Sequence, residues 1–340
     1  VTRIIDHNNR FLPDSLLFRT VAILGAIPIG LTLIFFSHVW ENSNEPFIIS
    51  QCLVVLITVL GAALIRNYDK ELFPSFIEEV SSIVVNEAEL FEVANRHKRF
   101  FVEKYWLASA TWTILIVAAV LANIEYFQAF GITSYQNVYF VIYLLFVAWF
   151  GIITGIGLHM VVTTIRCIRE VGDLELEIDP LHPDQLGGLS NIGTFAIRTT
   201  MMNSIGALAL PLAFTLAGSG GYESVIYAVV VIYMGAILFS FLYPTIYVNR
   251  RAEDIREAEL EERRERIHEI RGNAVEQAET GDNEQISIEK QLRIQTLKEE
   301  FNEYQSVRLY PFTVSIVTQL ASSVLLPIIF MLLETYVISA

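Results

Sequence analysis

Long runs of apolar residues, separated by shorter polar segments, dominate the chain. A helix needs about 20 mostly apolar residues to cross the hydrocarbon core of a bilayer. Because the runs are continuous rather than alternating, they predict helices and exclude a membrane-spanning strand barrel. Seven runs are long enough: residues 21–39, 47–65, 106–124, 138–164, 194–217, 225–248 and 312–338. The sequence therefore predicts an all-α fold, a polytopic membrane helix bundle with seven spans.

Lysine and arginine are distributed unevenly between the predicted spans. They occur before the first span, between the second and third, after the fourth, and between the sixth and seventh. Segments 40–46, 125–137 and 218–224 contain neither residue. Positive residues are retained on the cytoplasmic side of a membrane. We therefore expect a multi-pass protein of the cell membrane with its N-terminus in the cytoplasm, its C-terminus outside and most of its soluble mass cytoplasmic.

The long segment before the seventh span is rich in charge but keeps helical spacing. Apolar residues recur through 255–275 and again through 288–304, and Gly281, Asp282 and Asn283 separate the two series. This pattern predicts a cytoplasmic helical hairpin. The chain then divides into a six-span membrane bundle (1–248), the hairpin (249–310) and the seventh span (311–340). The hairpin is interpreted either as a solvated charged stalk or as a coiled-coil-like oligomerisation or gating domain. Residues 67–104 likewise predict an amphipathic helix or a bent pair.

The composition agrees with a membrane protein and bears on its partners. Hydrophobic residues make up 53% of the chain, which is too apolar for a soluble domain of this size. A net charge of −14 and a low lysine content are typical of a salt-adapted organism, so an archaeal, halophilic source is expected. No basic patch indicates nucleic-acid binding. Cys52 and Cys167 lie in or beside different spans, and we expect both to be packing residues.

Several functional classes lack the residues that they require. A retinal protein needs a lysine within a span, and all five lysines lie in predicted cytoplasmic segments. G-protein-coupled receptors place the N-terminus outside. The chain contains no Walker sequence, no potassium-channel filter sequence and no His-Glu-x-x-His motif. We therefore expect no enzyme activity, no cofactor and no metal centre.

The segment between the fourth and fifth spans has an unusual composition. Its block Pro-Leu-His-Pro-Asp-x-x-Gly-Gly-Leu at 180–189 resembles one found in a loosely defined group of prokaryotic multi-span membrane proteins without an assigned function. The resemblance implies no activity. Physically, Asp184 can accept backbone N–H groups, the two glycines permit a tight turn, and Ser190 or Asn191 can cap the fifth span. The alternatives are a gate or subunit contact, or a ligand or cation site. That site would be formed by Glu177, Asp179, His182 and Asp184.

Polar residues inside spans are the second functional signal, because each is costly in lipid unless it pairs or lines water. The cytoplasmic half of the seventh span carries them at intervals of three and four, and Glu334 lies near its outer end. The stripe consists of Ser315, Thr318, Gln319, Ser322 and Ser323. It is interpreted either as a pore lining or as helix packing through small polar residues. Further inward-facing candidates are His159, Thr163 and Thr164 in the fourth span and Arg198, Thr199, Thr200 and Asn203 in the fifth.

These patterns favour a cation-permeable ion channel built as a homo-oligomer in the lipid bilayer, with the seventh span lining the pore and ions as its partners. The topology is similar to that of insect chemoreceptor channels, which also combine seven spans with a cytoplasmic N-terminus. One alternative is a secondary transporter, which should show broken helices or an inverted repeat. Another is a membrane signalling receptor or enzyme that uses the 173–191 linker.

Overall fold

The computed structural model describes residues 14–177, 187–217, 223–279 and 284–306. Throughout these ranges the regular elements are helices, so the prediction of an all-α protein is confirmed. Five helices in the described part are long and apolar enough to cross a membrane: Glu45–Val80, Glu87–Ala122, Val138–Gly172, Ser190–Ala217 and Ser224–Ile270. They correspond to the second to sixth predicted spans, although the third helix ends at Ala122, two residues before the predicted end of its span. The first predicted span lies on helix α2 (Asp14–Val39), and the seventh lies outside the described residues.

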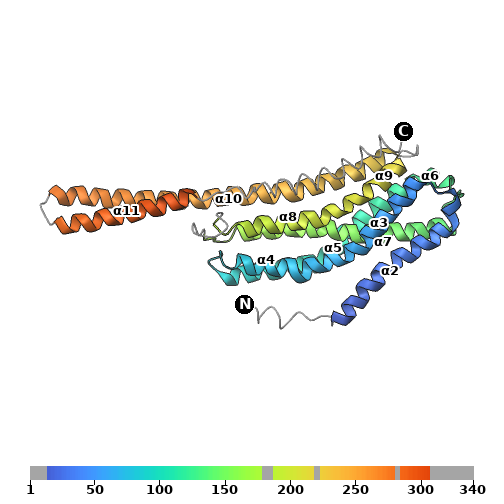
Figure 1. Ribbon diagram of the computed structural model, residues 1–340, viewed down its shortest axis with the longest axis horizontal. Coiled ribbons are helices and arrows are strands. Elements are labelled where there is room, and N and C mark those ends of the chain that lie inside the picture. Colours follow the sequence, from blue (N-terminus) through green and yellow to red (C-terminus); the bar gives the residue numbers. More distant parts are fainter. Residues whose placement is uncertain (1–13, 178–186, 218–222, 280–283, 307–340) are drawn as a thin grey trace.

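The helices form an elongated bundle that has two distinct ends (Figure 1). Helices α10 (Glu223–Glu279) and α11 (Glu284–Ser306) project from one end, which we call the hairpin end. The short helix α6 (Ile124–Gln128) lies at the opposite end, which we call the far end.

The second span does not stop at the end of its apolar run. Helix α3 (Glu45–Asn67) continues through a π-helical turn, η2 (Tyr68–Leu72), into α4 (Phe73–Val80). Pro74 explains the turn, because it has no N–H for the carbonyl four residues earlier and its ring crowds that carbonyl. Helix α5 (Glu87–Ala122) then returns as one helix. The bent pair expected in 67–104 is therefore present, and both of its arms are extensions of spans.

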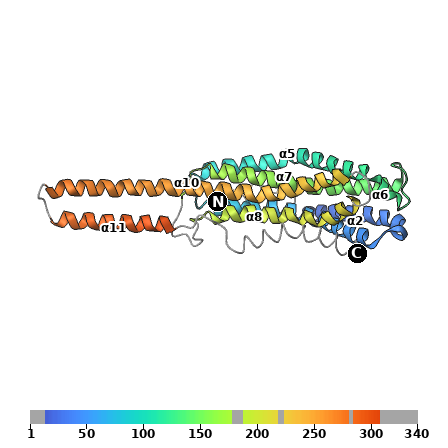
Figure 2. The ribbon, with the colours of Figure 1, turned by 90° about the horizontal axis from the view of Figure 1, so that it is seen from above.

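Helices α5 and α7 (Val138–Gly172) run side by side through the bundle, and small residues allow their close approach (Figure 2). A Cβ atom added to Gly151 would lie 2.9 Å from Cα of Thr113, and one added to Gly155 would lie 2.7 Å from Cα of Ser109. The Ser109 hydroxyl donates a hydrogen bond to the Ile152 carbonyl at 3.1 Å. Two small residues four apart on each helix thus form the contact, as is common between helices in membranes.

The far end is filled by aromatic rings, whereas the outer surface of the bundle is apolar. Phe35, Phe47, Phe127 and Tyr143 are all fully or almost fully buried and pack against one another. Large apolar side chains with more than half of their surface exposed include Leu33, Ile114, Val138, Leu145, Val231 and Phe239. Such a surface is stable in contact with lipid tails and is unusual for a protein in water.

The fifth span is interrupted. Helix α8 (Ser190–Ser204) gives way to a 3₁₀ turn, η3 (Ile205–Ala209), and helical structure resumes in α9 (Leu210–Ala217). Pro211 accounts for the interruption, because it cannot donate to the carbonyl of Ala207. The sequence had predicted one continuous helix over 194–217.

The sixth span continues unbroken into the projecting hairpin, so the expected boundary at 248 lies inside one helix. Helix α11 packs antiparallel to the distal part of α10. Arg263 Nε lies 3.8 Å from a carboxylate oxygen of Glu300, and the Arg264 guanidinium lies 5.5 Å from the centre of the Phe301 ring.

Two residues of α10 fix it to the C-terminal end of α7. The Tyr247 hydroxyl donates a hydrogen bond to Oδ1 of Asp173 at 2.6 Å, and Arg251 Nε donates to the Gly172 carbonyl at 2.9 Å. A cation at a helix C-terminus pairs with carbonyls that lack helical partners and with the negative end of the helix dipole. These two bonds attach α10, and with it the base of the hairpin, to the end of α7.

Replacing Arg251 by methionine should loosen this attachment while keeping the length of the side chain. Loss of a partly buried hydrogen bond costs about 1 kcal/mol, which corresponds to roughly fivefold faster exchange of the amides that it protects. Hydrogen exchange measured by mass spectrometry should show this increase in residues 247–255. Arg250→Met, on an exposed position of the same helix, is the control. Equal exchange in the two variants would mean that Arg251 does not hold α10 to α7.

Candidate functional site: a buried polar network

Polar side chains are buried between the helices in the hairpin half of the bundle. They come from η2, α5, α7, α8 and α10, and each is at most 6% exposed. We call this set the interior network: Tyr68, His97, His159, Thr163, Thr164, Thr199, Thr200, Asn203, Tyr233 and Ser240. Among the described residues, no Asp, Glu, Lys or Arg side chain is buried. The network therefore carries no charge unless one of its two imidazoles accepts a proton.

Tyr68 is the centre of the network. Its hydroxyl oxygen lies 2.7 Å from Oγ1 of Thr164 and 3.3 Å from Nε2 of His97, and Thr164 in turn lies 3.5 Å from Oγ1 of Thr199. Three elements thus meet at one hydroxyl group, and Thr164 links them to a fourth, α8. The π-helical turn η2 shifts the register of α3 and begins at Tyr68 itself. Turns of this kind occur frequently at functional sites.

Two buried imidazole rings lie within the network. His97 is 5% exposed and stacks on Phe73 at 4.1 Å, and His159 is 3% exposed and lies 5.8 Å from Phe101. Nδ1 of His97 and Nε2 of His159 have no hydrogen-bond partner within the described part of the chain. An unpaired buried nitrogen is costly, so these two atoms are the places where a water molecule or another neutral hydrogen-bonding ligand would be stabilised.

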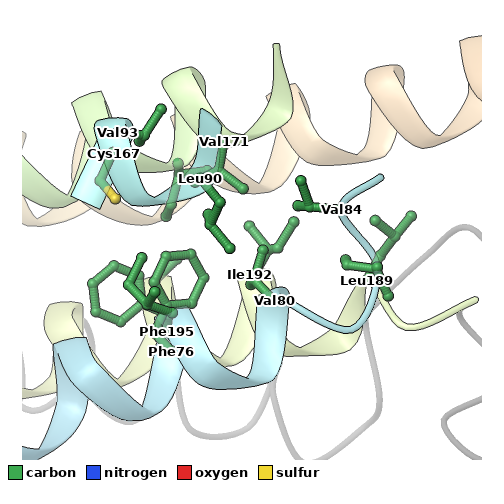
Figure 3. Packing of buried hydrophobic residues seen from close by; sticks show 14 of the residues in the cluster. Phe76, Val80, Val84, Leu90, Val93, Cys167, Val171, Leu189, Ile192 and Phe195 are labelled. Carbon is green, nitrogen blue, oxygen red and sulfur yellow. The ribbon is translucent and has the colours of Figure 1, made fainter. Parts of the chain in front are cut away.

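An apolar cluster closes the network toward the hairpin end (Figure 3). Phe76 from α4 and Phe195 from α8 stack with their centroids 4.1 Å apart. Val80, Leu90 and Ile192 are at most 1% exposed beside them. The cluster excludes water, and hydrogen bonds within the network are strengthened by these low-dielectric surroundings.

The network extends toward the middle of the bundle along α8 and α10. The hydroxyl oxygens of Thr200 and Ser240 lie 3.0 Å apart, and the Tyr233 hydroxyl donates to the Asn203 carbonyl at 2.5 Å. Beyond this level lies an apolar cavity of about 110 Å³, which Trp112 helps to line. The Trp112 indole N–H donates to the Thr154 hydroxyl at 3.0 Å.

The linker between the fourth and fifth spans is described only at its two ends. The Glu177 amide donates to the Ile83 carbonyl at 2.8 Å, and Val84 and Leu176 form an isolated antiparallel bridge. The side chain of Glu177 is exposed, whereas Asp179, His182 and Asp184 lie outside the described residues. The predicted ligand or cation site therefore stays a prediction. No group of three or more His, Cys, Asp or Glu side chains in the described ranges is arranged to hold a metal ion.

The turn into the fifth span is partly as predicted. Gly187 and Gly188 have φ angles of 66° and 90°, the left-handed region that favours glycine. Helix α8 begins at Ser190, and its N-cap residue is Leu189, which makes no side-chain cap. The prediction that Ser190 or Asn191 caps this span is therefore wrong. The turn rests on glycine conformation instead.

Of the polar residues that the sequence placed in the fourth and fifth spans, all but one are buried. His159, Thr163 and Thr164 of α7 and Thr199, Thr200 and Asn203 of α8 all belong to the interior network. Arg198 is exposed, which suits a charged side chain that reaches toward the interface. The pore-lining residues predicted in the seventh span lie outside the described residues: Ser315, Thr318, Gln319, Ser322, Ser323 and Glu334.

The sequence analysis missed Tyr68 and His97. Both lie just outside the predicted spans, where a polar residue carries no obvious cost, so burial could not be inferred from position. A usable signal was present in Pro74, which predicts an irregular turn in the helix that carries Tyr68.

Comparison with known proteins finds no relative of this chain. The chain matches no known protein family, no curated protein and no solved structure.

Proposed function

We propose that this protein is a subunit of a homo-oligomeric, cation-permeable ion channel of the cell membrane, with a pore lined by the seventh span. The observation that supports it is the spacing of polar residues in that span. Ser315, Gln319 and Ser322 recur at four and three residues, and the carboxylate of Glu334 follows near the outer end. Only one face of a helix can line water, so several copies around an axis would complete the wall.

The described helices support an ion pathway that does not run through the interior of their bundle. Aromatic rings occupy the far end of the bundle, and the buried side chains of the described part include no carboxylate, lysine or arginine. The outer surface carries large apolar side chains that suit lipid. In this proposal the N-terminus and the hairpin are cytoplasmic, and the attachment of α10 to α7 transmits hairpin movement to the bundle.

The proposal predicts that Glu334→Gln lowers single-channel conductance in a salt-dependent way. A ring of carboxylates raises the local cation concentration, and salt screens this effect. We expect roughly a twofold to fivefold loss at about 0.02 M salt and little loss at about 1 M, where the Debye length is about 3 Å. Purified protein in planar bilayers provides the measurement. Glu125→Gln, an exposed carboxylate of the bundle, is the matched control.

Cysteine scanning gives the second arm of the test. Positions in 315–334 that line the pore should react with water-soluble thiol reagents every three or four residues. Two results would rule out this pore. One is that no cysteine in 315–334 reacts with the thiol reagents in conducting protein. The other is that Glu334→Gln and the unaltered protein have the same conductance at low salt.

A secondary transporter is the second candidate, and the interruption of the fifth span at η3 favours it. Broken helices with unpaired backbone groups near the bilayer centre are characteristic of transporter binding sites. A transporter would concentrate solute in proteoliposomes along an imposed ion gradient and would give no single-channel steps. A channel would dissipate the gradient and give such steps.

A further inference from the structure

The apolar cavity that Trp112 helps to line is the second unusual feature of the bundle interior. Its volume is about 110 Å³. An apolar cavity of about 150 Å³ in a protein core stays dry and binds benzene, so this space can hold several carbon atoms. Helices α3, α5, α7, α9 and α10 contribute to its wall, together with η3.

The cavity is elongated in the direction of the helices. Its lining residues on α10 extend from Ile226 to Tyr233, which at about 1.5 Å per residue is a length of about 10 Å. On the fifth span they extend from Gly206 in η3 to Leu216 in α9. The long helices run along the bundle (Figure 1), so a narrow occupant would lie parallel to them.

The inner end of the cavity lies near the middle of the membrane. Trp112, Thr154, Gly206 and Tyr233 are the lining residues nearest to the hairpin end on their respective elements. The last three lie near the middle of the apolar runs 138–164, 194–217 and 225–248, each of which is long enough to cross a bilayer. From this level the cavity extends toward the far end of the bundle.

The wall offers almost nothing to a polar occupant. The lining residues include no charged side chain. The four polar side chains with an N–H or O–H group all donate within the protein: Trp112 to the Thr154 hydroxyl at 3.0 Å, Thr154 to the Phe150 carbonyl at 2.8 Å, Tyr143 to Oε1 of Gln51 at 3.4 Å and Tyr233 to the Asn203 carbonyl at 2.5 Å. A buried water molecule needs two to four polar partners, so the cavity favours an apolar occupant.

We propose that this cavity holds the methyl end of an acyl chain, contributed by a lipid of the leaflet at the far end of the bundle. Such a chain runs roughly parallel to the helices and ends near the centre of the bilayer, where the inner end of the cavity lies. The cavity is only partly enclosed, and Ile116, Ala213 and Val229 in its wall are half-buried. A chain can therefore enter between the helices.

Packing is the force that favours this occupant. A chain that leaves other lipid chains gains no hydrophobic free energy, because lipid is as apolar as the wall. The wall of an unfilled cavity, however, lacks the van der Waals contacts that a chain would supply. The lipid site does not depend on the proposed channel function, since it requires neither the seventh span nor an ion.

Photolabelling of the full chain in lipid nanodiscs tests the site. The probe is a phosphatidylcholine that carries a diazirine at the methyl end of one acyl chain, and labelled residues are identified by mass spectrometry. We expect label on Trp112 and Val147, which are 6% and 4% exposed and which lipid outside the bundle cannot reach. Val231, which is 68% exposed, should be labelled by the surrounding lipid and shows that the probe has reacted.

A matched pair of variants makes the test specific. Ala213→Phe places a phenyl ring in the cavity and should remove the label from Trp112 and Val147, while the label on Val231 stays. Ala228→Phe adds the same ring at an exposed position of α10 and should leave all three labels unchanged. If Ala213→Phe does not fold, the labelling of the unaltered protein decides.

The proposal fails if Val231 is labelled and Trp112 and Val147 are not, because the lipid chain then stays outside the bundle. It also fails if a free alkane with the same diazirine labels Trp112 and the phospholipid does not. The cavity would in that case admit small apolar molecules but no lipid chain. Label on Trp112 that persists in Ala213→Phe would place the chain elsewhere and would overturn the site as well.

Discussion

Gly155→Ala should destabilise the protein by about 1–3 kcal/mol, the typical cost of forcing an extra carbon into a close-packed contact. The new methyl group would lie 2.7 Å from Cα and 3.2 Å from the carbonyl oxygen of Ser109. Both atoms belong to the backbone, so no side-chain rotation relieves the clash. Helices α5 and α7 would have to separate, and the Ser109 to Ile152 hydrogen bond would lengthen. Thermal unfolding of detergent-solubilised protein measures the change.

Gly235→Ala is the control for this prediction, because a Cβ atom there would meet nothing within 4 Å. Alanine has the higher helix propensity by about 1 kcal/mol, so this variant should be as stable as the unaltered protein or slightly more stable. A Gly155→Ala protein as stable as Gly235→Ala would show that α5 and α7 are not in close contact in the membrane protein.

The sequence predicted the helices well, because each apolar run is long and the spacing of three and four marks a helix face. The cost of a polar group in lipid correctly indicated that His159, Thr163 and Thr164 face the interior. The Gly151 and Gly155 pair was equally readable as a small-residue motif, and Pro211 was readable as a helix breaker. These two local signals were present in the sequence and were not used.

The centre of the network could not be predicted in the same way. The Tyr68 hydroxyl meets His97, 29 residues away, and Thr164, 96 residues away, so no local pattern joins the three. Their meeting depends on the register shift at η2 and on the packing of α5 against α7. The backbone contact between Val84 and Leu176 is likewise a tertiary contact, and the sequence of neither segment predicts it.

Tyr68→Phe should destabilise the protein by about 1–3 kcal/mol, because it leaves Nε2 of His97 without its partner and leaves Thr164 with only the longer contact to Thr199 at 3.5 Å. Thr164 loses its shortest side-chain contact, at 2.7 Å, and His97 loses the only hydrogen bond that its Nε2 makes in the described structure. Thermal unfolding is again the measurement. Tyr105→Phe, at a position on α5 that is 43% exposed, should change stability by less than about 0.5 kcal/mol.

The double variant Tyr68→Phe with Thr164→Val tests whether the two residues stabilise the protein through their hydrogen bond or only through independent packing. Removing both partners of a hydrogen bond costs less than the sum of the two single losses, because the orphaned group disappears together with its partner. We therefore expect a coupling energy of about 0.5–3 kcal/mol between the two substitutions. Strictly additive effects would mean that Tyr68 and Thr164 contribute independently.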